Sequence, residues 1–95
     1  MTLRIPNDPP RDPITLALAA LAATLRDERR AQRFLDLTGI GTDELRHRLA
    51  DPTLLGAMLR FLEAHEPDLL GVAEELGLDA VDLVEARRQL EEGSA

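Results

Sequence analysis

The segment from Asp51 to Leu62 has the sequence DPTLLGAMLRFL. Asp51 can cap a helix, and Pro52 suits the first helical position, where its missing N–H has no helical partner. The apolar residues that follow point in nearly every direction around a helix axis, and they are Leu54, Leu55, Met58, Leu59, Phe61 and Leu62. Because a helix of this kind must be buried, we predict that this segment is the centre of the fold.

The same Asp-Pro start occurs at Asp12-Pro13, where a first helix is expected. Its apolar stripe recurs at helical spacing and consists of Ile14, Ala17, Leu18, Leu21 and Leu25. Leu16 and Ala20 widen the stripe, so this helix is expected to be largely buried.

Four shorter helices are predicted from capping residues and glycines. Their expected starting residues are Asp27, Thr42, Pro67 and Asp79. Gly39 and Gly77 are predicted to end the second and fifth helices in the left-handed conformation that glycine adopts easily. The side chains expected to face the core are Ala31, Phe34, Leu35, Thr38, Ile40, Leu45, Leu49, Leu69, Val72, Ala73, Leu76, Val81, Leu83, Val84, Ala86 and Leu90.

Composition also favours an all-α fold. Only Phe34 and Phe61 are aromatic, and most other hydrophobic residues are leucine or alanine. Apolar and polar residues nowhere alternate over the length of a strand. The 95 residues suffice for one domain. We therefore predict a compact bundle of about six short helices over residues 13–92, preceded by a flexible arm over residues 1–12.

The order of signals is similar in the two halves of the chain. Asp12-Pro13 corresponds to Asp51-Pro52, and Gly39-Ile40 corresponds to Gly77-Leu78. Each half would contain a long helix followed by two shorter ones. A duplication and a chance similarity between two leucine-rich helical stretches both account for this order.

Residue types needed for common catalytic chemistry are scarce. The chain has no cysteine and no lysine, which excludes thiolate metal sites, cysteine nucleophiles and Schiff-base chemistry. Its single serine is Ser94, near the end of the chain. Adjacent carboxylates such as Glu74-Glu75 diverge by about 100° on a helix. We therefore expect no enzyme activity and no cofactor.

The sequence also bears on location. The longest apolar run, Ile14 to Leu25, is too short to span a bilayer. Residues 1–13 lack the basic and apolar regions of a signal peptide. A cytoplasmic protein that binds no membrane is therefore expected.

One cluster resembles a metal site, because His65 is followed by Glu66 and Asp68 and preceded by Glu63. A second histidine at helical spacing is missing. Glu66 and Asp68 are better interpreted as charges that favour the start of a helix. We predict no metal site.

Helix-turn-helix spacing occurs twice, which makes DNA binding an alternative function. The residues with this spacing are Leu35, Gly39, Ile40 and Leu45, and again Ala73, Gly77, Leu78 and Leu83. Residues 51–95, however, carry three arginines against eleven acidic residues. Such a surface repels phosphate groups, so we expect these corners to serve packing and expect no nucleic-acid partner.

A basic stripe on the predicted second helix is the candidate protein-binding site. It consists of Arg26, Arg29, Arg30 and Arg33, opposite the apolar face. A solvated surface is one interpretation, and docking of an acidic partner is the other. The partner could be another protein, or a second copy of the chain through its acidic Glu74, Glu75, Asp79 and Asp82.

Several motifs resemble a family of short, all-helical alphaproteobacterial proteins classed as a domain of unknown function. They are Arg33 to Ile40, Asp43 to Arg46, Asp51-Pro52, Phe61-Leu62, Glu66, Leu69-Leu70, Ala73-Glu74 and Gly77-Leu78. The resemblance covers residues 14–90. It implies an all-helical fold and brings no activity, cofactor or catalytic residue. Together with the composition, it favours a small protein–protein interaction or regulatory module.

Overall fold

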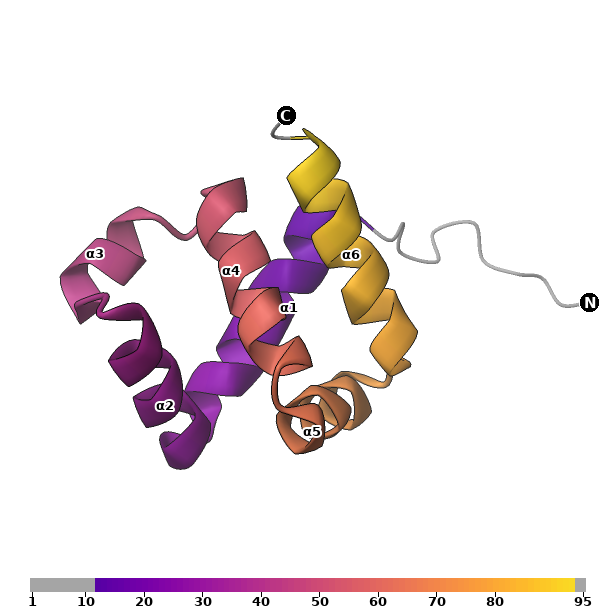
Figure 1. The fold of residues 1–95 in the computed structure, drawn as a ribbon, viewed down its shortest axis with the longest axis horizontal. Helices are drawn as coiled ribbons and strands as arrows, with labels where there is room; N and C mark the ends of the chain where they lie inside the picture. The colour runs from indigo at the N-terminus through magenta and orange to yellow at the C-terminus, as the bar shows by residue number, and fades with distance from the viewer. Residues whose placement is uncertain (1–11, 94–95) are drawn as a thin grey trace, which may run out of the picture.

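The computed structural model describes residues 12–93, and this part of the chain forms six helices without a strand (Figure 1). They are α1 (Pro13–Arg26), α2 (Glu28–Thr38), α3 (Thr42–His47), α4 (Pro52–Glu63), α5 (Glu66–Leu76) and α6 (Ala80–Gly93). The predicted all-α bundle of six helices is confirmed. The predicted flexible arm lies outside the described residues, apart from Asp12.

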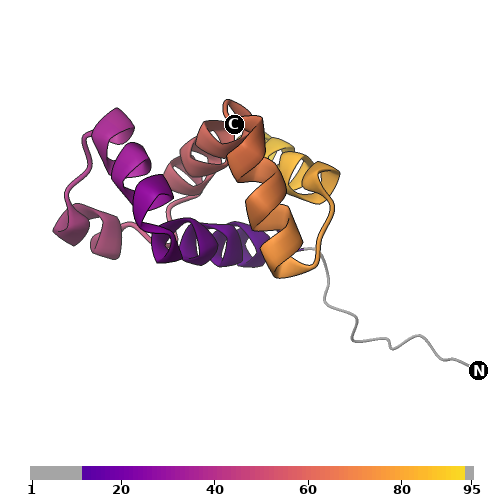
Figure 2. The ribbon, with the colours of Figure 1, turned by 90° about the horizontal axis from the view of Figure 1, so that it is seen from below.

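Helices α1 and α4 form the centre of the molecule together. Helix α1 packs against α2, α4, α5 and α6, and α4 packs against α1, α5 and α6. In Figure 1, α2 and α3 lie on one side of α4, and α5 and α6 lie on the other. Figure 2 shows the same division from below, with α1 along the base.

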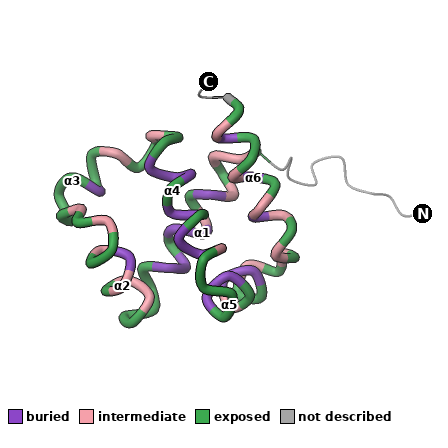
Figure 3. Tube along the Cα trace, in the orientation of Figure 1, coloured by how far each residue is buried: buried purple, intermediate pink, exposed green. Residues whose placement is uncertain are grey.

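The predicted burial of α4 is confirmed. Its large apolar side chains are all buried, and they are Leu54, Leu55, Met58, Leu59, Phe61 and Leu62. Figure 3 shows the buried positions concentrated on α4 and on the α1 face beneath it. Burial on this scale, at about 1.5–3 kcal/mol for each large side chain, makes α4 the main source of hydrophobic stabilisation.

The predicted inner stripe of α1 is partly wrong. Leu18 and Leu25 are 37% and 36% exposed, whereas Ala17, Ala20 and Ala23 are fully buried. Small side chains on the inner face let the neighbouring helices approach α1 closely, which displaces the leucines outward. Thr24 is also buried, and its hydroxyl donates a hydrogen bond of 2.8 Å to the Ala20 carbonyl.

Local start and stop signals were mostly predicted correctly. The carboxylates of Asp12, Asp27 and Asp51 each accept a hydrogen bond from a backbone N–H in the first turn of the helix that follows. Gly39 and Gly77 both have φ of 70° and end α2 and α5, as predicted.

Three other predictions need correction. Gly41, not Thr42, is the N-cap of α3, and no side chain caps that helix. Leu49 follows the end of α3 and is 39% exposed, because the helix stops at His47 before this side chain can turn inward. Val81 is 65% exposed, and α6 is held instead by Leu83, Ala86 and Leu90.

The two halves agree in helix order but differ at their ends. Helix α3 has six residues, of which only Leu45 is buried. Helix α6 has fourteen residues and packs along both α1 and α4. The second half is therefore closely packed, whereas the first half ends in a short helix at the edge of the molecule.

Candidate functional site

Three of the four arginines in the predicted stripe face α5. Arg26 is the last residue of α1, and Arg30 and Arg33 are three residues apart on one side of α2. On α5, Asp68 and Glu75 are seven residues apart and likewise share a side. The two sets meet, and we refer to Arg26, Arg30, Arg33, Asp68 and Glu75 as the arginine ladder.

The arginines of the ladder, from Arg26 at the end of α1 to Arg33 on α2, meet the carboxylates of α5 in reverse order, from Glu75 to Asp68. Arg26 donates to Glu75 Oε2 from both Nε, at 3.1 Å, and Nη2, at 2.7 Å. Arg30 lies between the two carboxylates, 3.7 Å from Asp68 Oδ1 and 3.6 Å from Glu75 Oε1. Arg33 Nη1 donates to Asp68 Oδ2. The ladder therefore holds α2 against α5 through long side chains.

Gly71 makes room for the central rung. It lies between Asp68 and Glu75 on the same side of α5, and a Cβ atom there would be 3.0 Å from Arg30 Nη2. The guanidinium of Arg30 therefore rests directly on the α5 backbone. Arg30 and Asp68 have side chains only 16% and 12% exposed, so this rung is shielded from water more than an ordinary surface ion pair.

The last rung joins the ladder to the core. The Arg33 guanidinium carbon lies 5.2 Å from the centroid of the Phe61 ring, within range of a cation–π interaction. Phe61 in turn meets Phe34 edge to face, with centroids 5.4 Å apart. The two aromatic residues of the chain thus link α2 to α4 beneath the ladder.

Two carboxylates at this corner have lowered pKa values. A hydrogen bond from Arg26 lowers the pKa of Glu75, and partial burial opposes this effect. The backbone N–H of Arg30 lowers the pKa of Asp27 at the start of α2. Both carboxylates therefore stay ionised to lower pH than ordinary acidic side chains.

Arg29, the fourth arginine of the predicted stripe, is placed differently. Its side chain is exposed and makes no ion pair within residues 12–93. It borders an open hollow of about 310 Å³ at the ladder, whose other lining residues are Asp27, Arg30, Arg33, His65 and Asp68. The structure thus separates the stripe into three arginines with partners in the chain and one that faces solvent. Whether the stripe binds a protein stays a prediction.

Sequence reasoning missed the pairing across α2 and α5. The signal was the spacing of Asp68, Gly71 and Glu75, which puts two acids on either side of a glycine on one helix face. The spacing does not say which helix lies opposite. Residues 51–95 carry eleven acidic residues and three arginines. The ladder gives this excess of acid a structural role, because basic residues of the first half bind acidic residues of the second.

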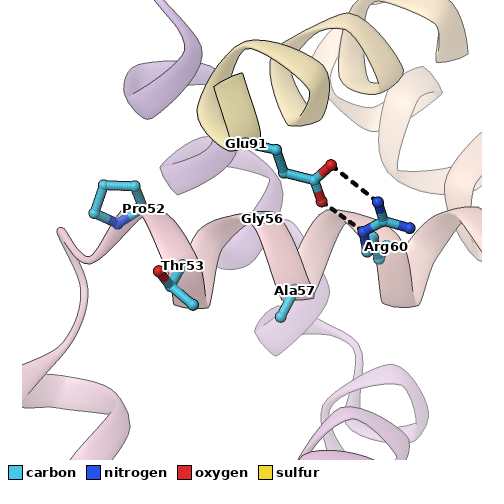
Figure 4. A pocket seen from close by; sticks show the side chains of 6 residues that line it. All are labelled: Pro52, Thr53, Gly56, Ala57, Arg60 and Glu91. Carbon is cyan, nitrogen blue, oxygen red and sulfur yellow. Dashed lines mark hydrogen bonds and ion pairs between the residues drawn. The ribbon is translucent and has the colours of Figure 1, made fainter. Parts of the chain in front are cut away.

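A second network of ion pairs ties α4 to α6 (Figure 4). Arg60 binds Glu91 through two hydrogen bonds of 2.5 and 2.9 Å, and Arg87 binds Glu63 at 2.6 Å and Glu91 at 2.8 Å. The hydrogen bond from Arg60 lowers the pKa of Glu91. The adjoining hollow of about 370 Å³ is otherwise lined by Pro52, Thr53, Gly56 and Ala57. Arg60 and Glu91, the two ionisable residues that line it, are bound to each other, and Glu91 also binds Arg87.

Metal ligation and membrane insertion have no support in the described chain. Within residues 12–93 no three histidine or acidic side chains come together in a way that could hold a metal ion. His65 is exposed at the start of α5 and borders the arginine hollow. None of the six helices is long and apolar enough to cross a membrane.

Comparison with known proteins identifies a family. No curated protein and no solved structure shows significant similarity to the chain. A family model with the description "Protein of unknown function (DUF3572)" matches residues 10–93. This span includes every motif on which the resemblance to a domain of unknown function rested, and all six helices. The chain therefore belongs to the DUF3572 family.

Proposed function

We propose that this protein is a small, non-enzymatic interaction module that docks an acidic segment of another protein at the hollow beside the arginine ladder. The observation that carries the proposal is the position of Arg29. It is a fully charged, exposed side chain without an ion pair among the described residues, at the edge of a hollow already lined by Arg30 and Arg33.

The charge of the hollow suits a single carboxylate. Three arginines face two carboxylates, Asp27 and Asp68, so one positive charge is uncompensated before His65 is considered. An exposed ion pair is worth only about 0–1 kcal/mol. The arginines would therefore orient the partner and speed its association, while neighbouring contacts supply most of the affinity.

The other function classes have less support. The ionisable side chains of both networks are paired with one another, which leaves them poorly suited to proton transfer. DNA binding through α3 would rest on a helix of six residues whose first turn carries Asp43 and Glu44. Arg48 beyond it is bound to Glu44 and Asp51 at 3.1 and 2.9 Å. A contact of Arg48 with phosphate would have to break these pairs.

A second copy of the chain is a weaker candidate than a different protein. In a head-to-tail contact the arginines of one copy would bind Glu75 and its neighbours on the next. Glu75 already binds Arg26 and Arg30 of its own chain, so a contact made through Glu75 would replace an existing one. A different acidic protein faces no such competition.

The proposal is tested by photocrosslinking in the native cell followed by charge reversal. A benzophenone amino acid is placed at position 29 in one variant and at position 88 in another, because Arg88 is also exposed but lies on α6. We expect an acidic protein to be crosslinked from position 29 and not from position 88. Purified Arg29→Glu should then bind that protein several-fold more weakly at low ionic strength, while Arg88→Glu binds it as the wild type does.

Two outcomes would contradict the proposal. One is the same set of crosslinks from both positions. The other is unchanged affinity and association rate in Arg29→Glu, with circular dichroism showing an intact fold. Arg29 is the suitable residue to reverse because its side chain has no partner in the described chain, so the substitution leaves the ladder in place.

A further inference from the structure

An apolar groove lies between the end of α1 and α3, away from the arginine ladder. It has a volume of about 230 Å³, and its lining residues are Leu25, Thr42, Leu45, Arg46 and Leu49. Leu25 and Leu49 are more than one-third exposed, whereas Leu45 forms the buried floor. Figures 1 and 2 both show α3 at the edge of the molecule, remote from α5 and α6.

An exposed apolar stripe on α1 ends at Leu25, which also lines the groove. Leu18, Ala22 and Leu25 are exposed and are spaced four and three residues apart, so they form one stripe on this helix. No charged residue occurs in α1 before Arg26. In a chain of which 31% of residues are charged, this uncharged and exposed helix face stands out as a place where another apolar surface would be buried.

The charge beside the groove indicates what that surface carries. Arg46 is the one charged residue among those that line it, and Arg46 makes no ion pair within residues 12–93. A partner that covers Leu25 and Leu49 would bring its own side chains next to this guanidinium. An acidic side chain there would gain a charge-assisted contact, and a basic one would be repelled.

The size of the surface favours a single helix. Three leucines, each exposed by little more than one-third, and one alanine fall far short of the roughly 800 Å² per partner that a stable dimer of folded domains buries. The apolar face of one amphipathic helix, with residues repeating at i, i+3 or i+4 and i+7, matches this groove together with the stripe on α1.

We infer that the groove formed by Leu25, Leu45 and Leu49, with the α1 stripe beside it, binds an amphipathic helix of a protein partner whose apolar face is flanked by acidic residues. This inference rests on the proposed function, since both require a protein partner. It concerns a different surface, so each can fail alone.

The probe for the test is a synthetic, helix-stapled peptide of about 16 residues with leucines at i, i+3, i+7 and i+10 and glutamates beside them. Its matched control has lysine at every glutamate position. Binding to the full chain is followed through the leucine methyl signals in NMR spectra and through fluorescence anisotropy. We expect the glutamate peptide to shift the methyl signals of Leu25, Leu45 and Leu49 and to bind more tightly than the lysine peptide.

Two variants make the result specific. Arg46→Glu changes an exposed side chain without an ion pair, so it should fold normally, weaken binding of the glutamate peptide about fivefold and reverse the preference between the peptides. Leu49→Glu should abolish binding of both. Arg29→Glu should leave binding unchanged, which separates this groove from the arginine hollow.

Three results would overturn the inference. The first is the absence of methyl shifts in the groove. The second is equal binding of the two peptides to the wild type. The third is self-association of the chain, measured by analytical ultracentrifugation, that Leu49→Glu abolishes, because the occupant would then be a second copy.

Discussion

Alanine substitutions at Gly39 and Gly56 should change the stability of this protein in opposite directions. Gly39 has φ of 70°, and no atom lies within 4 Å of the position that a Cβ would take. The only penalty for alanine is therefore the left-handed backbone, at about 1–2 kcal/mol. Reduced freedom of the unfolded chain returns about 0.4–1 kcal/mol. We expect a net loss of about 1 kcal/mol, and the same at Gly77, where φ is also 70°.

Gly56 is the matched control, because it lies inside α4 with helical geometry. A Cβ there would be 3.7 Å from Glu91 Cγ, an ordinary contact distance. Alanine should stabilise the helix by about 0.5–1 kcal/mol. The free energies of unfolding are obtained from urea denaturation followed by circular dichroism at 222 nm. The reasoning is refuted if Gly39→Ala is as stable as the wild type, or if Gly56→Ala is less stable than it by more than about 0.5 kcal/mol.

Two further predictions concern the core and the arginine ladder. Leu59→Ala, at a fully buried position, should lower the free energy of unfolding by about 2–5 kcal/mol, whereas Leu37→Ala, at a position 72% exposed, should change it by less than about 0.5 kcal/mol in the same urea experiment. Similar losses in the two variants would contradict the central position of α4. The second prediction follows from the lowered pKa of Glu75, whose carboxylate stabilises the fold above the ordinary glutamate pKa and loses this effect as pH falls through its folded value. Between about pH 5 and pH 3, the free energy of unfolding should therefore fall less steeply in Glu75→Gln than in the wild type, while Glu74→Gln, which removes a carboxylate without an ion pair in the described chain, should follow the wild type. Equal slopes in all three proteins would show that the Glu75 pair contributes nothing.

The parts of the fold that were predicted correctly depend on neighbouring residues. An aspartate before a proline, or a glycine after an apolar turn, acts on the backbone within four residues, so the sequence contains the whole interaction. The burial of α4 was also predictable, because its apolar residues surround the axis whatever the neighbours are. Gly39 and Gly77 show the same dependence on local structure, since each ends its helix at the residue expected.

The side of α1 that faces the core could not be predicted, and the reason is physical. The outside of a helix is usually marked by charged residues, and α1 has none between Pro13 and Leu25. Hydrophobicity alone then favours the leucines as the inner face. Close packing against three or four neighbours favours the alanines instead, and this choice depends on how near those helices come. As a result, the exposed side of α1 carries Leu18 and Leu25 and no charged residue before Arg26.

The candidate site was half predictable. Helical spacing predicted a stripe of Arg26, Arg29, Arg30 and Arg33 on one helix, whereas Arg26 ends α1 and the other three lie on α2. Which of them bind α5 depends on the crossing of two helices more than thirty residues apart in the sequence. Gly71 favours the central contact, because a Cβ there would lie 3.0 Å from Arg30 Nη2 and the guanidinium would have to shift.

The ladder also affects how salt dependence should be interpreted. Salt screens an ion pair between Arg29 and a partner, and it equally screens the exposed rung between Arg26 and Glu75, whose side chains are 58% and 36% exposed. High salt can therefore weaken binding by loosening the α2–α5 contact, even if Arg29 touches no partner. Charge reversal at Arg29, measured at a fixed salt concentration, changes the contact between Arg29 and the partner and leaves the α2–α5 contact as it is. Loss of binding in Arg29→Glu at low salt, with thermal stability unchanged, therefore identifies a direct contact in a way that a salt titration of the wild type does not.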